Sequence, residues 1–370
     1  MSSNHTPSEP LIERISGFNY SYRMRCECGR SSTVSAVDYW DHQDTGLIPC
    51  EHCGKDIHYG RLATVLRDPN DPAMSNDAVA RFAWYHTSSF PEWPPTNYPE
   101  LMRAALESLD TRCGIQIESA LQRATTKALH VGTYEASIEN MHRRMQNQND
   151  ADKVFYLHRV RLAVAAKDIS SDTRDETQDA VSQIALDELR HADLLAVRYL
   201  NVYESPGSLS LAIDPVAIES VQTIELPVAD LAEKPPSGLV DALRQFTDEL
   251  SAADALMPDL SDVDREQSRL RFLFPRAGDE LAIRVKASEM RSRQAWTGIE
   301  RLLADTYLRN VNPVVLNNFT AAVTPRSHED PCEAVNEFHD RFRGHAAALT
   351  RAEELVTLLK KRPVRHLSGK

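Results

Sequence analysis

Long apolar runs are absent from this sequence of 370 residues. No stretch approaches the roughly 20 consecutive apolar residues that a membrane-spanning helix requires, so we expect no membrane partner. The segment 1–10 has neither a basic start nor an apolar core, which argues against an ordinary secretory signal and for a cytoplasmic protein. The sequence also has no excess of positive charge. The net charge of -12 argues against broad, nonspecific coating of nucleic acid.

Fingerprints for binding phosphates are also lacking. The chain contains neither the G-x-G-x-x-G pattern of dinucleotide-binding folds nor the Walker A pattern of NTPases. The middle of the chain mixes strand-like and helix-like periods without glycine-rich loops between them. These features favour an α+β fold over a doubly wound one.

The composition is that of a folded chain with a sizeable core. Hydrophobic residues make up 42% and charged residues 26%, and the length predicts two or three domains. Turn-rich breaks at 67–72 and 235–238 divide the sequence. We therefore expect a small β module over 18–66, an α+β domain over 76–231 and a helical domain over 238–362.

Cysteines are too few for a disulfide scaffold, but four of the six form two close pairs. The pairs are Cys26 with Cys28 and Cys50 with Cys53, each followed by glycine. Turns of this kind can direct four thiolates at one structural zinc ion, and a module this small needs such a metal in order to fold. Because a four-ligand site is closed, we expect no catalysis there.

The first pair is one residue shorter than the usual zinc-ribbon knuckle. A histidine could therefore replace one of the cysteines, and the candidates are His42, His52 and His58.

Three short motifs in the middle region carry side chains suited to chemistry. In the first, Leu129–Thr133, a predicted strand ends at His130 and is followed by Gly132, Thr133 and a predicted helix. Glycine at such a junction lets a ligand approach the backbone closely.

The second motif opens a predicted strand over 154–162. Its Tyr156 is an aromatic side chain that can stack on a flat heterocycle.

The third motif, Tyr199–Leu211, places Glu204 at the end of an apolar predicted strand, before a turn and another strand. A carboxylate in such a setting usually has a partner or a task, because burying it is costly.

Together the three motifs resemble the ADP-ribosyltransferases of the diphtheria toxin and poly(ADP-ribose) polymerase class, which carry histidine, tyrosine and glutamate on successive strands. The resemblance covers about a hundred residues, from His130 to Ile224. Val131 is an extra residue between the histidine and the glycine. No second tyrosine follows Tyr156 in a short helix, as it does in the toxins.

The resemblance implies a split β-sheet core and NAD as substrate. It implies that Glu204 stabilises the ribosyl cation formed when nicotinamide leaves, and that Tyr156 stacks on nicotinamide. His130 would hold the adenosine ribose. The backbone at Gly132, next to Thr133, would hold the carboxamide. The implied acceptor is a macromolecule, protein or nucleic acid, and toxin, defence and housekeeping roles stay open.

Several alternatives remain. His86, at the end of a predicted strand over 81–87, competes with His130 as the ribose ligand. The chain could also be a zinc-ribbon adaptor or nucleic-acid-binding protein. A third possibility is an enzyme of the same fold that hydrolyses NAD or removes a 2′-phosphate from RNA.

Overall fold

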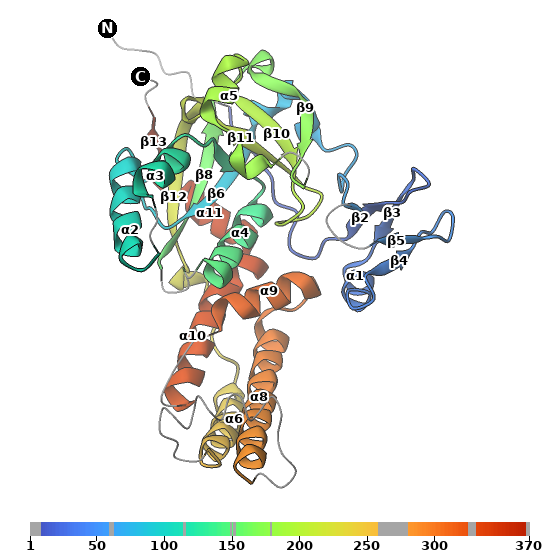
Figure 1. Cartoon of the computed structure of the whole chain (residues 1–370), viewed down its shortest axis with the longest axis vertical. Coiled ribbons are helices and arrows are strands. Elements are labelled where there is room, and N and C mark those ends of the chain that lie inside the picture. The colour runs from blue at the N-terminus through green and yellow to red at the C-terminus, as the bar shows by residue number, and fades with distance from the viewer. Residues whose placement is uncertain are drawn as a thin grey trace. The chain divides into compact units, whose positions relative to one another are not determined.

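A computed structural model of the chain shows a mixed α+β protein (Figure 1). It describes residues 9–58, 63–113, 116–148, 150, 153–177, 180–257, 280–324 and 331–367. Residue contacts divide the chain into two units. One comprises 1–228, 310–322 and 348–370, and the other comprises 229–309 and 323–347.

Two sheets form the centre of the first unit. The five strands of one sheet, in spatial order, are β1 (Ile12–Glu13), β6 (Phe82–Ser88), β8 (Phe155–Leu162), β12 (Ile218–Leu226) and β13 (Arg365–His366). The four strands of the other, in spatial order, are β7 (Leu129–Val131), β11 (Leu209–Ile213), β10 (Ala196–Leu200) and β9 (Ile169–Asp175). Pairing is antiparallel except between β1 and β6 and between β9 and β10.

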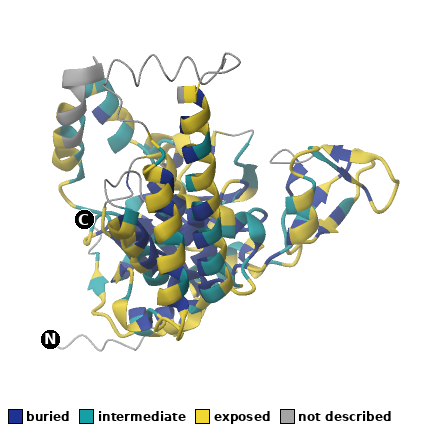
Figure 2. Ribbon diagram, turned by 90° about the horizontal axis from the view of Figure 1, so that it is seen from below, coloured by how far each residue is buried: buried dark blue, intermediate teal, exposed yellow. Residues whose placement is uncertain are grey.

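Apolar side chains from both sheets share one core. Figure 2 colours the buried segments of the ribbon dark blue. Trp84 and Val160 come from the first sheet, and Val131 and Leu211 come from the second. The residues of β11 are buried on both faces, which explains why its sequence lacks an apolar–polar alternation.

The two sheets are joined where β6 meets the end of β7. Tyr85 and Gly132 exchange two backbone hydrogen bonds of 2.9 Å. A Cβ atom on Gly132 would lie 2.5 Å from the Ser210 Oγ atom, so no larger residue fits without a shift. Thr133 follows as the N-cap of helix α4 (Tyr134–Asn147), and its side chain accepts a hydrogen bond from the Ala136 N–H.

A small module of two hairpins precedes this core. Its elements are β2 (Tyr22–Arg25), β3 (Ser31–Val34), α1 (Ala36–Asp41), β4 (Leu47–Pro49) and β5 (Asp56–His58). Phe18, Tyr20, Tyr22 and Met24 alternate with polar or small residues, which predicts a strand. β2 confirms it for Tyr22 and Met24 only, because Phe18 and Tyr20 lie before the strand. Tyr59 and Leu62, expected to continue the last strand, lie outside the described residues.

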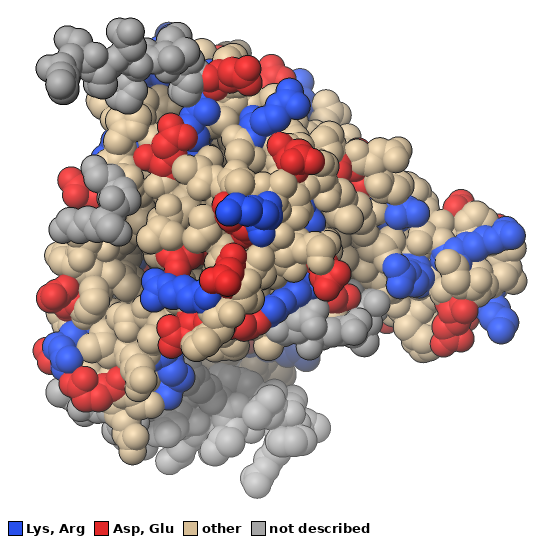
Figure 3. All heavy atoms as spheres, turned by 90° about the horizontal axis from the view of Figure 1, so that it is seen from above, with Lys and Arg blue, Asp and Glu red and all other residues tan. Residues whose placement is uncertain are grey.

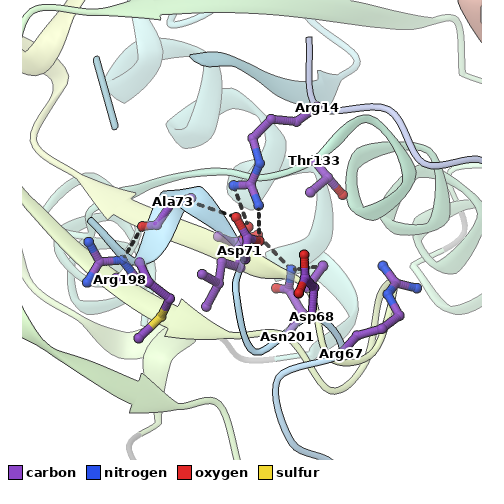
Figure 4. A network of polar contacts seen from close by, with 12 residues as sticks. Arg14, Arg67, Asp68, Asp71, Ala73, Thr133, Arg198 and Asn201 are labelled. Atoms are coloured by element: carbon purple, nitrogen blue, oxygen red, sulfur yellow. Dashed lines mark hydrogen bonds and ion pairs between the residues drawn. The ribbon is translucent and has the colours of Figure 1, made fainter. Parts of the chain in front are cut away.

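The turn-rich segment after this module is packed against the core. Figure 4 shows Arg14 and Asp71 pointing toward one another, and the Arg14 guanidinium donates to Asp71 Oδ2 at 2.6 Å. The buried Arg198 of β10 donates to the carbonyl of Ala73 at 2.7 Å. The segment 67–72 therefore has fixed contacts and is more than the linker that its composition indicated.

Helices dominate the C-terminal part of the chain, as predicted. They are α6 (Leu239–Asp254), α8 (Glu280–Tyr307), α9 (Pro313–Val323), α10 (Pro331–Thr350) and α11 (Ala352–Lys360). In the second unit α6 packs on α8, where Ser288 donates to the Ala253 carbonyl and Gly298 leaves room for the Phe246 ring. Cys332 lies in a helical pattern of the sequence, which predicts a buried thiol, but it is exposed in the structure.

The helical prediction for 176–192 was wrong in its first half. Glu176 lies in a turn after β9, and among the described residues of this stretch, 176–177 and 180–192, α5 (Leu186–His191) is the one α-helix. The long helix predicted from Tyr98 is two helices, α2 (Tyr98–Cys113) and α3 (Ile117–Thr125).

Candidate functional site

Four cysteines of the hairpin module lie close enough together to hold a metal ion. The Sγ atoms of Cys26, Cys28, Cys50 and Cys53 all fall within 4.8 Å of one another. Cys26 and Cys53 are 3.6 Å apart, and Cys28 and Cys50 are 3.9 Å apart. A tetrahedron with zinc–sulfur bonds of about 2.3 Å has sulfurs about 3.8 Å apart, so the cluster fits a structural zinc.

The two pairs adopt the same turn despite their different lengths. In each pair, the backbone N–H of the first cysteine donates a hydrogen bond of 2.8 Å to the carbonyl of the residue that follows the glycine. The glycines, Gly29 and Gly54, have φ of +83° and +70°, a conformation that other residues rarely adopt. The shorter first knuckle therefore still directs both its thiols inward.

The histidine alternatives lie outside the cluster of metal-ligating atoms. The ring of His42 contacts the Asp38 carbonyl, and that of His52 contacts the Ser31 carbonyl. Backbone N–H groups, first that of His52, lower the pKa of Cys50 to about 6 and so favour the thiolate that binds metal.

A second candidate site is a cavity of about 220 Å³ where the two sheets meet α4. Its lining comes from β6, β7, α4, β10, β11 and the segments that follow β9 and β10. The lining residues are Tyr85, His86, Thr87, His130, Val131, Gly132, Ala136, Ser137, Asn140, Arg143, Glu176, Ser182, Tyr199, Asn201, Glu204 and Ser210. His130, Gly132 and Glu204, singled out from the sequence, thus share one cavity with the alternative His86.

Glu204 is the most strongly held acid of the cavity. Its side chain is 9% exposed and forms an ion pair with Arg143 of α4. Asn140, one turn earlier, donates to the same carboxylate oxygen at 3.2 Å. α4 therefore supplies two donors to Glu204, and the Arg143 side chain is 42% exposed to solvent.

The two histidines of the cavity differ in their surroundings. His86 stacks on Trp93 with 4.2 Å between ring centroids, and its Nδ1 lies 2.8 Å from the His130 carbonyl. Nδ1 must carry the proton, because a carbonyl only accepts. The Nδ1 of His130 instead meets the Tyr199 hydroxyl at 3.1 Å. Burial lowers the pKa of His86 to about 3 and that of His130 to about 4, so both are neutral at pH 7.

Glu176 is a second acid in the cavity. Its Oε2 accepts hydrogen bonds from the Val202 N–H at 2.8 Å and the Tyr203 N–H at 3.4 Å. Burial raises its pKa to about 7, and the nearby Glu204 adds to that shift.

The loop that carries Glu204 is fixed from its other side by the chain around the hairpin module. Glu139 of α4 accepts from the Ser205 N–H at 2.8 Å and from the Tyr20 hydroxyl at 2.7 Å. Arg67 donates to Ser205 Oγ at 3.0 Å and stacks over the Tyr20 ring. The position of Glu204 thus depends on residues that flank the cysteine cluster in sequence.

Two of the residues expected at the site lie elsewhere. Tyr156 pairs with Ser88 and Glu225 near the start of β8 and is not part of the cavity lining. Thr133 caps α4 next to the cavity without lining it. Tyr156 lies near the start of β8, where a side chain can face either side of the sheet. The sequence of β8 does not show which side Tyr156 faces.

Arg143, Asn140 and Glu176 were missed by sequence reasoning. Asn140 and Arg143 are three residues apart on α4, a spacing that places them on one helix face. That spacing could have been noticed once His130 and Gly132 were suspected. Glu176 gave no such signal, because its stretch was assigned to a helix.

A larger, more open hollow of about 730 Å³ lies between α2 and α3. Among its described lining residues the charged one is Glu118, which is exposed and paired with Arg103. The smaller cavity is the better candidate for chemistry, because neutral histidines, an arginine and two carboxylates converge in it.

Comparison with known proteins gives no relative: no family model, curated protein or solved structure matches this chain. Among the described residues, no helix is long and apolar enough to span a membrane.

Proposed function

We propose that the chain is an NAD-dependent ADP-ribosyltransferase that modifies a macromolecular target, protein or nucleic acid. The observation that carries this proposal is the cavity in which His130, Gly132 and Glu204 meet, although they come from distant parts of the sequence. These are three of the residues through which the sequence resembles that class.

The cavity has the chemistry that cleavage of the nicotinamide–ribose bond requires. The bond breaks through a transition state with positive charge on the ribose, as in glycoside hydrolysis. The Glu204 carboxylate would stabilise that charge. Arg143 would release the carboxylate when the ribose binds. Neutral His130 would bond a ribose hydroxyl, and the backbone at Gly132 would hold the carboxamide.

The size of the cavity suits one end of the dinucleotide. Pockets for whole ligands measure about 300 to 1,000 Å³, which is more than the 220 Å³ found here. We assign the enclosed space to the nicotinamide riboside part of NAD, so His130, which lines it, would bond the nicotinamide ribose and not the adenosine ribose that the resemblance implies. Since Tyr156 lies outside the lining, Tyr85 or Tyr199 would provide the aromatic contact.

The charges of the cavity favour this reaction over phosphate removal from RNA. Among the described lining residues Arg143 is the one Lys or Arg, and the histidines are neutral. Two carboxylates in the same space would repel a phosphate monoester.

The cysteine cluster would hold one structural zinc and take no part in the reaction. A role as a nucleic-acid adaptor finds less support. On the face drawn in Figure 3, the described Lys and Arg side chains lie among Asp and Glu, with no large basic patch. The protein would work in the cytoplasm.

Incubation with NAD labelled on its adenine and a cell lysate tests the proposal. We expect the label to become attached to a macromolecule, and digestion with protease or nuclease then identifies its class. Wild-type protein that neither labels any product nor releases nicotinamide would contradict the proposal.

A further inference from the structure

Glu176 and Glu204 meet in one cavity although they follow different strands. Glu176 comes after β9, and Glu204 lies in the loop after β10, the strand that pairs with β9. Glu176 is bound to the backbone of that same loop, at Val202 and Tyr203. The two carboxylates are therefore held in a fixed relation.

The two acids differ in which of their carboxylate oxygens already accept hydrogen bonds. Glu204 receives an arginine and an asparagine side chain and is suited to remain a carboxylate. Glu176 uses Oε2 for the loop N–H groups, which leaves Oε1 without a hydrogen-bond partner among the described residues. A carboxylate with one anchored and one unoccupied oxygen is oriented to exchange a proton at the second.

We propose that Glu176 is a second catalytic residue of this cavity, the base that takes the proton from a neutral hydroxyl acceptor, water included. This inference rests on the proposed NAD-dependent function. In the step, the C1′–N bond of NAD breaks and its electron pair stays on nicotinamide, which leaves neutral. The acceptor oxygen forms a bond to C1′, its O–H bond breaks, and the proton passes to Glu176 Oε1.

The surroundings of Glu176 suit a base that works near neutral pH. The titratable and charged groups that face it are Glu204 in the neighbouring loop, Arg143 on α4 and Tyr199 on β10. Burial and Glu204 raise its pKa to about 7, so the carboxylate takes up a proton readily and is still available at neutral pH.

The test uses NAD with water or azide as acceptor, so no natural acceptor is needed. In Glu176→Gln the amide oxygen still accepts from Val202, and we expect nicotinamide release into water to fall by about 100-fold or more. Azide needs no deprotonation. It should therefore restore nicotinamide release in this variant and give ADP-ribosyl azide, whereas Glu204→Gln should not respond to azide.

The pH profile provides a second readout. Wild-type activity should fall below pH 7 as Glu176 becomes protonated, and this fall should vanish in Glu176→Gln. Burial also raises the pKa of Glu139 to about 7, so Glu139 could produce the same pH dependence. Glu139→Gln is the control for this, and its activity should still fall below pH 7. Glu225→Gln, on an exposed position of β12, is the matched surface control.

The outcomes separate this inference from the proposed function. A wild-type protein that releases no nicotinamide overturns both. An active wild type with an equally active Glu176→Gln, or an impaired Glu176→Gln that azide does not restore, overturns the role of Glu176 and leaves the proposed function standing. Glu176→Ala, checked by thermal melting, repeats the azide test with more space for the anion.

Discussion

Single residues of the cavity owe their properties to their neighbours more than to their type. Glu204 and Glu176 are both glutamates, but one lies against a guanidinium and the other against backbone N–H groups in a partly buried turn. Environments that distinguish two acids in this way are typical of sites that use one acid for charge and the other for proton transfer.

The two histidines can be separated by mutation. His130→Ala should raise the Kd for NAD about tenfold, the effect of one lost hydrogen bond, with little change in melting temperature. His86→Ala should lower the melting temperature, because it removes a ring stacked between Trp93 and the His130 carbonyl. Calorimetric titration with NAD and thermal melting measure both effects.

The reverse result would exchange the two roles. If His86→Ala abolishes NAD binding at an unchanged melting temperature while His130→Ala binds normally, His86 is the ribose ligand.

At the residue scale, the sequence predicted part of the candidate site. His130, Gly132 and Glu204 could be found because each lies in or shortly after a strand whose apolar residues are visible in the sequence. Tyr156 could not be placed, because a strand turns successive side chains to opposite faces and its neighbours Phe155 and Leu157 are the buried ones.

At the scale of elements, the loop 201–208 connects β10 and β11 and positions Glu204. Gly207 has a φ of +83° and packs against the segment that leaves the hairpin module. Its carbonyl accepts from the Arg67 N–H at 2.8 Å. A change at Gly207 therefore tests how firmly the loop must be held.

Gly207→Ala should destabilise the protein more than Gly46→Ala does. Both glycines have positive φ, which alone costs alanine about 1 kcal/mol. A Cβ on Gly207 would also lie 2.9 Å from the Val65 carbonyl oxygen, whereas a Cβ on Gly46 meets nothing within 4 Å. Chemical denaturation measures the difference. Equal losses of stability would show that the loop relaxes freely.

Most predicted strands and helices of the middle region are present in the structure, because their apolar periods are clear. β9 was not recognised, since it is an edge strand with mostly polar, partly exposed residues. Assigning the turn that follows β9 to a helix over 176–192 hid Glu176. The packing of 67–72 was also not predictable, because it depends on Arg14 and Arg198, which are distant in sequence.

At the scale of the whole molecule, the hairpin module with its four cysteines and the cavity belong to the same contact unit. Tyr20 and Arg67 flank the module and contact Glu139 and Ser205, next to Glu204. Loss of metal should therefore affect both folding of the module and the position of the loop that carries Glu204.

Metal analysis should find about one zinc per chain. Cys50→Ser should lose the zinc and melt at a lower temperature, because three ligands hold the metal poorly. Cys332→Ser, at an exposed position outside the cluster, is the matched control. It should keep the zinc and the melting temperature of the wild type. A metal-free wild type, or a Cys50→Ser variant with unchanged stability, would contradict the zinc site.

The most direct test of the account is NAD binding and cleavage by Glu204→Gln beside the wild type. Carboxylate and amide have nearly the same shape, so NAD affinity should be retained. The negative charge that stabilises the ribosyl cation is lost, and nicotinamide release should fall about 100- to 1,000-fold. Full release of nicotinamide by Glu204→Gln, at an affinity equal to that of the wild type, would contradict the central claim.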